Sequence, residues 1–131
     1  MYLLDTNICI YIIKKTPPAI VEKIKTFQPN HIKISAISLA EMEYGVAKSV
    51  YREKNKAALI DFVSAFDIIA FDDNDAELYG LIRANLEQRG CVIGPYDMEI
   101  AAQALSRNLT LVTNNVFEFE RIPNLKIENW A

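Results

Sequence analysis

Short apolar runs alternate with longer helical segments along the whole chain, and this alternation limits the folds that are open to it. Each run has the length and composition of a buried strand. Strands separated by helices require parallel crossover connections and a sheet covered on both faces. We therefore predict an α/β fold, a three-layer sandwich with a mainly parallel sheet of four to five strands. The predicted strands are residues 1–4, 31–36, 67–71, 109–113 and, at an edge, 125–130.

Helical periodicity and chain-breaking residues predict the segments between the strands. The first helix, residues 6–15, ends in a lysine pair, and Pro17 and Pro18 then begin a second helix that reaches Phe27. Residues 92–95 are predicted to form a turn. The remaining predicted helices are 38–49, 52–66, 74–90 (ended by Gly90), 96–108 and the short helical turn 115–122.

Length and composition favour one domain that comprises residues 1–131, because no repeat, linker or low-complexity segment divides the chain. No apolar run approaches the ~20 residues that span a bilayer, and the N-terminus lacks the pattern of a signal peptide. Cys9 and Cys91 lie outside any metal-binding spacing and are expected to be reduced. These features predict a cytoplasmic protein with no membrane partner.

The charge is divided unevenly between the two halves of the chain. Residues 1–66 contain nine Lys and Arg against six Asp and Glu, whereas residues 67–131 contain five against eleven. If the protein binds nucleic acid, the basic N-terminal half is where phosphate contacts would gather. The only histidine, His31, makes a zinc site based on histidine or a Ser–His–Asp triad improbable.

Several polar residues follow predicted strands, at the edge where parallel α/β sheets bind ligands. Asp5 follows the first strand, Glu41 comes soon after the second, and Thr113 and Asn115 follow the fourth. Asp97 lies in the first turn of the helix that leads into the fourth strand, so it can reach the same edge.

Each of these residues also has a structural interpretation. Asp5 and Asn115 could cap helices, and Ser38 with Glu41 matches a capping box. Asp97 could stabilise its helix by interacting with the positive N-terminal end of the helix dipole. Convergence of several carboxylates on one edge instead indicates a cation, and oxygen ligands suit Mg²⁺ or Mn²⁺. Such ions support phosphodiester cleavage without histidine or cysteine.

The sequence resembles the PIN-domain family and, within it, the VapC-type toxin ribonucleases of bacterial toxin–antitoxin modules. Four stretches carry the resemblance in the family's order and cover nearly the whole chain. They are LLDTNICIYIIK, SAISLAEMEYGVAKS, IGPYDMEIAAQALSRNLTLVTNN and EFERIPNLKIENW.

The resemblance implies an endoribonuclease that depends on Mg²⁺ or Mn²⁺. The family's first three acids fall on Asp5, Glu41 and Asp97, which would be the metal ligands. The supporting polar positions of the family fall on Thr6, Asn7 and Thr113.

The fourth acidic position departs from the pattern of many relatives, because Asn115 stands where Asp is common. An asparagine can position a water or a weaker second ion, but it carries no charge. Asn115 is therefore retained as a catalytic residue. Glu118 is a further acid that could act through space.

The resemblance also implies partners. The expected substrate class is RNA, in particular tRNA. Related toxins suggest cleavage in the anticodon loop of initiator tRNA. Residues 37–60 and the first helices match the part that forms a homodimer surface and a groove for a VapB-like antitoxin, whose basic side chain would be directed at the carboxylates.

Two alternatives remain open from the residues. A phospho-acceptor domain of the receiver type has a similar length, but it requires an acidic pair after its first strand, whereas Asp72 and Asp73 follow the third. A PIN-like domain that has lost catalysis is favoured by Asn115 and opposed by the three retained acids.

Overall fold

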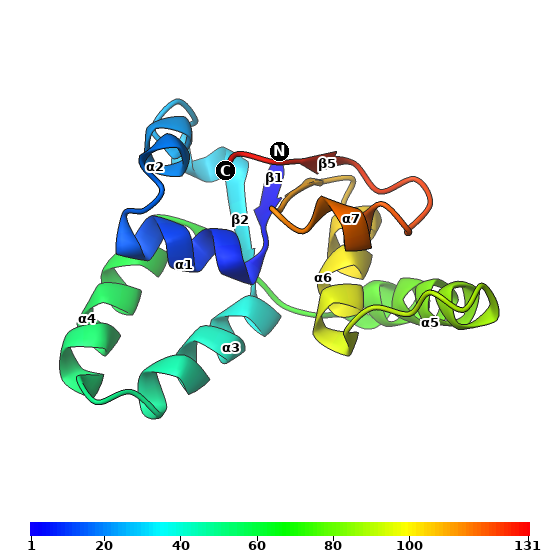
Figure 1. Ribbon diagram of the computed structural model, residues 1–131, viewed down its shortest axis with the longest axis horizontal. Coiled ribbons are helices and arrows are strands. Elements are labelled where there is room, and N and C mark those ends of the chain that lie inside the picture. The colour runs from blue at the N-terminus through cyan, green and yellow to red at the C-terminus, as the bar shows by residue number, and fades with distance from the viewer.

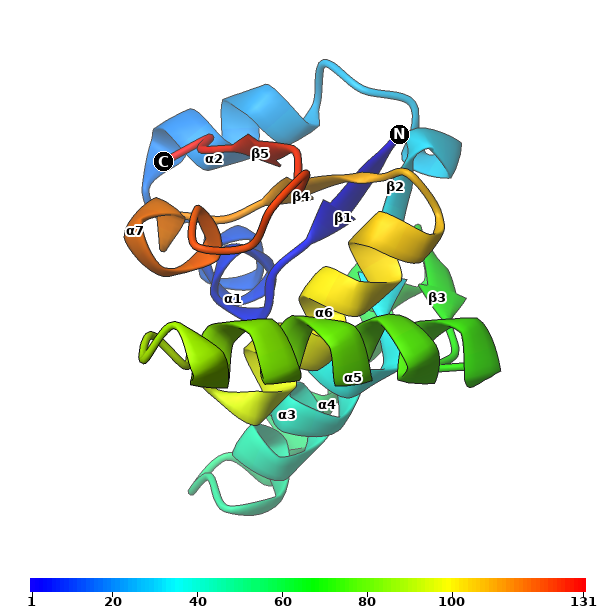
Figure 2. The same ribbon diagram turned by 90° about the vertical axis from the view of Figure 1, so that its right-hand side faces the viewer.

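Five parallel strands form one sheet in the computed structural model, which describes all 131 residues. Helices cover both faces of the sheet, as Figures 1 and 2 show from two directions. The predicted α/β sandwich is confirmed, and the strand order is β3-β2-β1-β4-β5. The strands are β1 (Tyr2–Leu4), β2 (Ile32–Ser35), β3 (Asp67–Ile69), β4 (Thr110–Val112) and β5 (Ile127–Glu128).

Helices fill every connection between consecutive strands. Because parallel strands need long crossovers, each connection returns the chain to the same end of the sheet. None of the helices is long and apolar enough to cross a membrane. The helices are α1 (Thr6–Lys14), α2 (Pro18–Ile24), α3 (Ala36–Ala47), α4 (Arg52–Val63), α5 (Asp73–Gln88), α6 (Pro95–Ser106) and α7 (Val116–Phe119), with a short 3₁₀ turn at Pro29–His31.

Successive residues of the central strands feed two separate cores, because side chains of a strand alternate between the faces of the sheet. Leu3 and Leu111 pack with α5, α6 and α7 on one face. Leu4 and Val112 pack with α1, α2, α3 and α4 on the other. Both faces are therefore buried, as the continuous apolar strands predict.

The predicted start of α3 is wrong by two residues. Ser35, not Ser38, is the N-cap, and its hydroxyl accepts a hydrogen bond from the backbone N–H of Ile37 at 2.9 Å. The helix therefore begins directly at the end of β2, and Ser38 is buried inside it rather than capping it. This earlier start places Ser38 and Glu41 one helical turn apart on one face of α3.

Other boundaries differ by a few residues. β3 and β5 are shorter than the predicted runs, and residues 92–94 form an irregular segment before Pro95 opens α6. Helix α5 begins one residue earlier than predicted because Asp72 and Asp75 form a reciprocal capping box. Gly90 follows α5 with a φ of 68°, the left-handed conformation that glycine adopts easily.

Both cysteines are free, as predicted. Cys9 is fully buried in the core around α1, where burial and the nearby Asp5 carboxylate raise the pKa of its thiol. A thiol that is held protonated in this way packs as a small apolar group.

Candidate active site

The candidate site lies between β1 and β4, where the order of the strands reverses. From β1 the chain continues to β2 and β3 on one side, whereas β4 and β5 lie on the other. Ligands of open α/β sheets bind at the carboxyl ends of the strands at such a switch point. Asp5 directly follows β1 and Thr113 directly follows β4, so both stand at this position.

Asp5 is buried, with only 5% of its surface exposed, and both of its carboxylate oxygens are engaged. Oδ1 accepts a hydrogen bond from the backbone N–H of Asn7 at 2.7 Å, which makes Asp5 the N-cap of α1. Oδ2 accepts a hydrogen bond from the Thr113 hydroxyl across the switch point. Burial raises the pKa of Asp5, and these hydrogen bonds partly oppose that shift.

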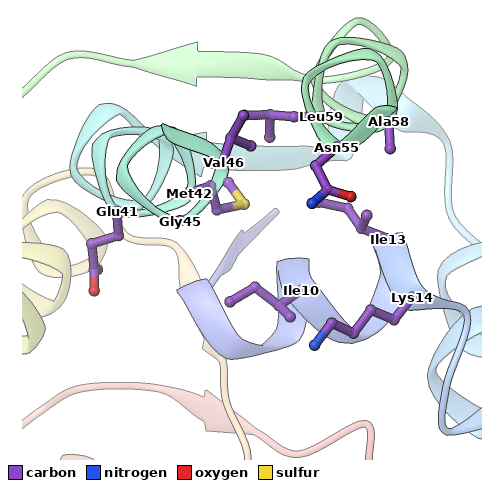
Figure 3. Close-up of a pocket in the computed structure, with 10 residues that line it drawn as sticks. All are labelled: Ile10, Ile13, Lys14, Glu41, Met42, Gly45, Val46, Asn55, Ala58 and Leu59. Atoms are coloured by element: carbon purple, nitrogen blue, oxygen red, sulfur yellow. The ribbon is translucent and has the colours of Figure 1, made fainter. Parts of the chain in front are cut away.

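Glu41 is positioned by α1, because the first turn of that helix contacts α3. The Thr6 hydroxyl donates a hydrogen bond to Glu41 Oε1 at 2.8 Å and lies 2.9 Å from the hydroxyl of buried Ser38. Figure 3 shows the Glu41 side chain directed away from its neighbour Met42 and toward α6. Thr6, which directly follows Asp5, thus links the start of α1 to the second acid, Glu41.

Asp97 is a half-buried acid on which three other carboxylates act. It lies in the first turn of α6, and the pKa of its carboxyl is raised to about 6 by burial and then by the charges of Asp5, Glu118 and Glu41. The charges of Asp5, Glu118 and Glu41 therefore reach the Asp97 carboxyl, which is partly shielded from solvent screening. The convergence of Asp5, Glu41 and Asp97 on one metal site stays a prediction.

Asn115 occupies the N-cap position of α7, but its side chain does not cap the helix. Its amide instead donates a hydrogen bond to Glu118 Oε2 at 2.8 Å, while its backbone N–H donates to the Thr113 hydroxyl at 2.9 Å. Asn115 therefore holds a carboxylate that lies near Asp97. The spacing of three residues within one helical turn is the sequence signal for this pair.

Asn7 contributes through its backbone alone, since its side chain is exposed. Two contributors were not assigned to the site from the sequence. Ser38 supports Thr6 from inside α3, and Glu99 lies close enough to Glu41 for burial and that charge to raise the pKa of Glu99. Ser38 was missed because the sequence predicted it to be the N-cap of α3 rather than a residue inside the helix. Glu99 follows Asp97 by two residues, and no sequence motif distinguishes it from an ordinary helix residue.

The donor set suits a hard divalent cation, because it consists of carboxylates with threonine and asparagine behind them. The raised pKa of Asp97 reports repulsion among these charges, which a bound cation would relieve. As the side chains stand, no three His, Cys, Asp or Glu residues are close enough to enclose an ion. Binding would therefore draw the carboxylates together.

This fold and this acidic edge define a nuclease-like α/β domain, and comparison with known proteins identifies its class. The PIN domain matches residues 2–125. The chain belongs to the PIN-domain family.

Relatives over the full length place the chain among the VapC ribonucleases of that family. The chain is 47% identical to ribonuclease VapC2 of Rickettsia felis over 99% of this chain and 98% of that protein. It is 43% identical to the tRNA(fMet)-specific endonuclease VapC of Salmonella typhimurium, with the same coverage of each chain. The chain is thus a ribonuclease of the VapC type.

Solved structures agree. The toxin chain of VapBC from Salmonella typhimurium bound to DNA superposes with a TM-score of 0.94 at 43% identity, covering 99% of this chain and 98% of that chain. The corresponding chain of VapBC2 from Rickettsia felis, bound to a DNA fragment from the promoter, gives a TM-score of 0.93 at 46% identity with the same coverage.

Proposed function

We propose that this chain is the toxin of a type II toxin–antitoxin module, an endoribonuclease that hydrolyses RNA phosphodiester bonds with Mg²⁺ or Mn²⁺. The observation that carries the proposal is the raised pKa of Asp97 among Asp5, Glu41 and Glu118 at the switch point of the sheet. Clustered carboxylates at this place favour a divalent cation over a lone acid or base.

Asp5, Glu41 and Asp97 are the proposed metal ligands, with Glu118 as the fourth acid. A bound Mg²⁺ or Mn²⁺ would lower the pKa of a water and stabilise the departing oxygen of the phosphodiester. Thr113 and Thr6 hold Asp5 and Glu41 in place through the hydrogen bonds described above. Asn115 acts by orienting Glu118, and its amide is also the group proposed to position a water.

The proposed substrate class is tRNA, with cleavage in the anticodon loop of initiator tRNA as the specific expectation. The Salmonella typhimurium relative carries the name tRNA(fMet)-specific endonuclease. The excess of lysine and arginine in residues 1–66 supplies phosphate contacts on the side of the sheet formed by α1 to α4.

Removal of divalent metal is expected to stop cleavage without unfolding the chain. Treatment with EDTA should abolish cleavage of labelled tRNA, and Mg²⁺ or Mn²⁺ should restore it, because the carboxylates alone supply no positive charge to the scissile phosphate. Denaturing gels measure cleavage, and circular dichroism provides the folding control. Cleavage at an unchanged rate in EDTA would refute the metal-dependent mechanism.

A groove beside the acids is the proposed antitoxin site. A cavity of about 330 Å³ lies between α1, α3 and α4, with Glu41 at one end (Figure 3). Its floor is apolar, so it suits the apolar face of a peptide, while a basic side chain of that peptide could reach Glu41. The apolar lining consists of Ile10, Ile13, Met42, Val46, Ala58 and Leu59.

Filling this groove should release the toxin from its antitoxin. In Ala58→Phe, the added ring occupies space between α1 and α4 far from the acids, so we expect weaker antitoxin binding and unchanged RNA cleavage. Ala57→Phe on the adjoining surface of α4 is the matched control, since Ala57 does not line this groove. Titration of cleavage with the antitoxin of the same module measures the effect. Equal inhibition of both variants would place the antitoxin elsewhere.

A homodimer is proposed as the form in solution, by analogy with the family. The mass from light scattering at several concentrations tests this directly, and a monomer at all of them would contradict it.

A further inference from the structure

Exposed aromatic side chains lie on the helices that carry the site acids. Four aromatic residues have more than half of their surface exposed: Tyr44 at 67%, Tyr51 at 71%, Tyr96 at 56% and Phe117 at 72%. Two of these four, Tyr96 and Phe117, directly precede a site acid along the chain, and Tyr44 lies one helical turn after Glu41. Burial of an aromatic ring is favourable, so a ligand that covers three exposed rings on the elements of one site would gain free energy from them.

One of the three rings shares a helix face with its acid, and the other two belong to direct sequence neighbours of theirs. Tyr44 follows Glu41 by three residues in α3, which places the two on neighbouring positions of one helix face. Tyr96 immediately precedes Asp97 in the first turn of α6, and Phe117 immediately precedes Glu118 in α7. The three rings therefore lie on α3, α6 and α7, the helices that also carry Glu41, Asp97 and Glu118.

Two of the rings carry a cation over one face. The Lys48 ammonium lies 4.9 Å from the centroid of the Tyr44 ring, and the Arg121 guanidinium lies 5.1 Å from that of Phe117. Such pairs bring positive charge to the rim of an otherwise acidic site, where a polyanion could not approach without it.

An exposed ring beside a cation is the arrangement that single-stranded nucleic acids recognise. Unpaired bases stack on aromatic faces, and the cations contact the adjacent phosphates. A duplex cannot use these rings, because its bases are already stacked on one another.

We propose that Tyr44, Tyr96 and Phe117 form a base-stacking rim that binds unpaired nucleotides on both sides of the scissile phosphate, with Lys48 and Arg121 on the flanking phosphates. The inference rests on the proposed ribonuclease function and deepens it, because it names the side chains that would bind the unpaired nucleotides of the substrate. The rim residues are positioning residues.

Direct binding tests the rim without requiring catalysis. Asp97→Asn serves as the background so that RNA is not cleaved, and a fluorescent short unpaired RNA is compared with the same RNA annealed to its complement. Tyr44→Ala, Tyr96→Ala and Phe117→Ala should each weaken binding of the unpaired RNA by about 5- to 100-fold. Binding of the duplex should not change. Tyr44→Phe, Tyr96→Phe and Phe117→Tyr, which keep a ring, should bind normally.

Tyr51→Ala is the matched control, since it removes an equally exposed ring that is not next to an acid. Lys48→Ala and Arg121→Ala should each reduce the salt dependence of binding by about 0.7 in the log–log slope. The proposal is overturned if the alanine variants bind unpaired RNA like their parent, or if they lose duplex binding equally. It is also overturned if Tyr44→Ala only converts a dimer to a monomer and leaves RNA binding per chain unchanged.

The two proposals fail in different ways. If the unaltered chain shows no metal-dependent cleavage of any RNA, the ribonuclease mechanism fails whatever the binding data show. If the unaltered chain cleaves and the rim variants bind and cleave unpaired RNA at its rate, only the rim fails.

Discussion

Asp97→Asn is expected to reduce RNA cleavage on the order of 10³-fold or more and to leave the fold intact. Burial raises the pKa of Asp97 to about 6, and the charges of Asp5, Glu118 and Glu41 contribute to this rise. Asparagine keeps the shape and removes the charge that would hold a cation. Because it also relieves repulsion among like charges, stability should not fall.

Initial rates of tRNA cleavage with saturating Mg²⁺ measure this effect, and thermal unfolding monitors the fold. Asp5→Asn should lose cleavage to the same extent. Asp61→Asn, an exposed acid on α4, is the matched control and should cleave normally. If purified Asp97→Asn cleaved RNA at the original rate, the assignment of Asp97 to the metal site would be wrong.

Arg107→Leu is expected to cause a large loss of stability, because Arg107 is the counter-charge of a buried acid. Arg107 Nη1 donates a hydrogen bond to Asp75 Oδ1 at 2.5 Å, and Nη2 donates to the Ala70 carbonyl at 3.0 Å. The Asp75 side chain is fully buried, whereas a quarter of the Arg107 side chain is exposed. Removal of the cation leaves a buried carboxylate with no counter-charge, which costs about 3 kcal/mol.

That loss corresponds to a decrease of about 10 °C in melting temperature for a chain of this size. Arg83→Leu removes an arginine from an exposed ion pair with Glu87 and should cost less than about 1 kcal/mol. If the two variants were equally stable, the buried pair would contribute no more than a surface pair does.

The pH dependence provides a second readout of the same pair. Burial raises the pKa of Asp75, but hydrogen bonds from Arg107, Ser106 and the backbone of Asp72 outweigh it and hold the pKa below its usual value. A depressed pKa contributes stability that is present above about pH 4 and is lost as the pH falls through the folded-state pKa. In Arg107→Leu this contribution is absent, so its stability difference from the unaltered chain should narrow as the pH falls below about 4.

The sequence predicted the fold class well because buried parallel strands produce short, continuous apolar runs that helices must separate. Leu3 and Leu4 illustrate this, since the two neighbours are buried on opposite faces. The strand order could not be derived in the same way. It depends on which strands pair across long crossovers, and no local pattern near Tyr2 indicates that β1 lies between β2 and β4.

The candidate acids were found because strand ends converge on one edge, but the details of the site were not. Judged from the local sequence, Ser35 and Ser38 are equally good N-caps for α3. Only the point at which β2 ends, which its pairing in the sheet determines, decides between them. The orientation of Asn115 toward Glu118 depends on rotamers that spacing does not determine. The acidic pair that a receiver domain would use is explained differently, since Asp72 caps α5.

The hydrogen bond between Asp5 and Thr113 joins residues 108 positions apart and depends on β4 pairing beside β1. A ribosome makes the chain from its N-terminus, so Asp5 emerges early and Thr113 late. Until β4 has left the ribosome, β1 lacks one neighbour, and Asp5 lacks the hydroxyl that holds it. We therefore expect a partly synthesised chain to lack the Asp5–Thr113 contact, so that this part of the site is assembled only once β4 has been made.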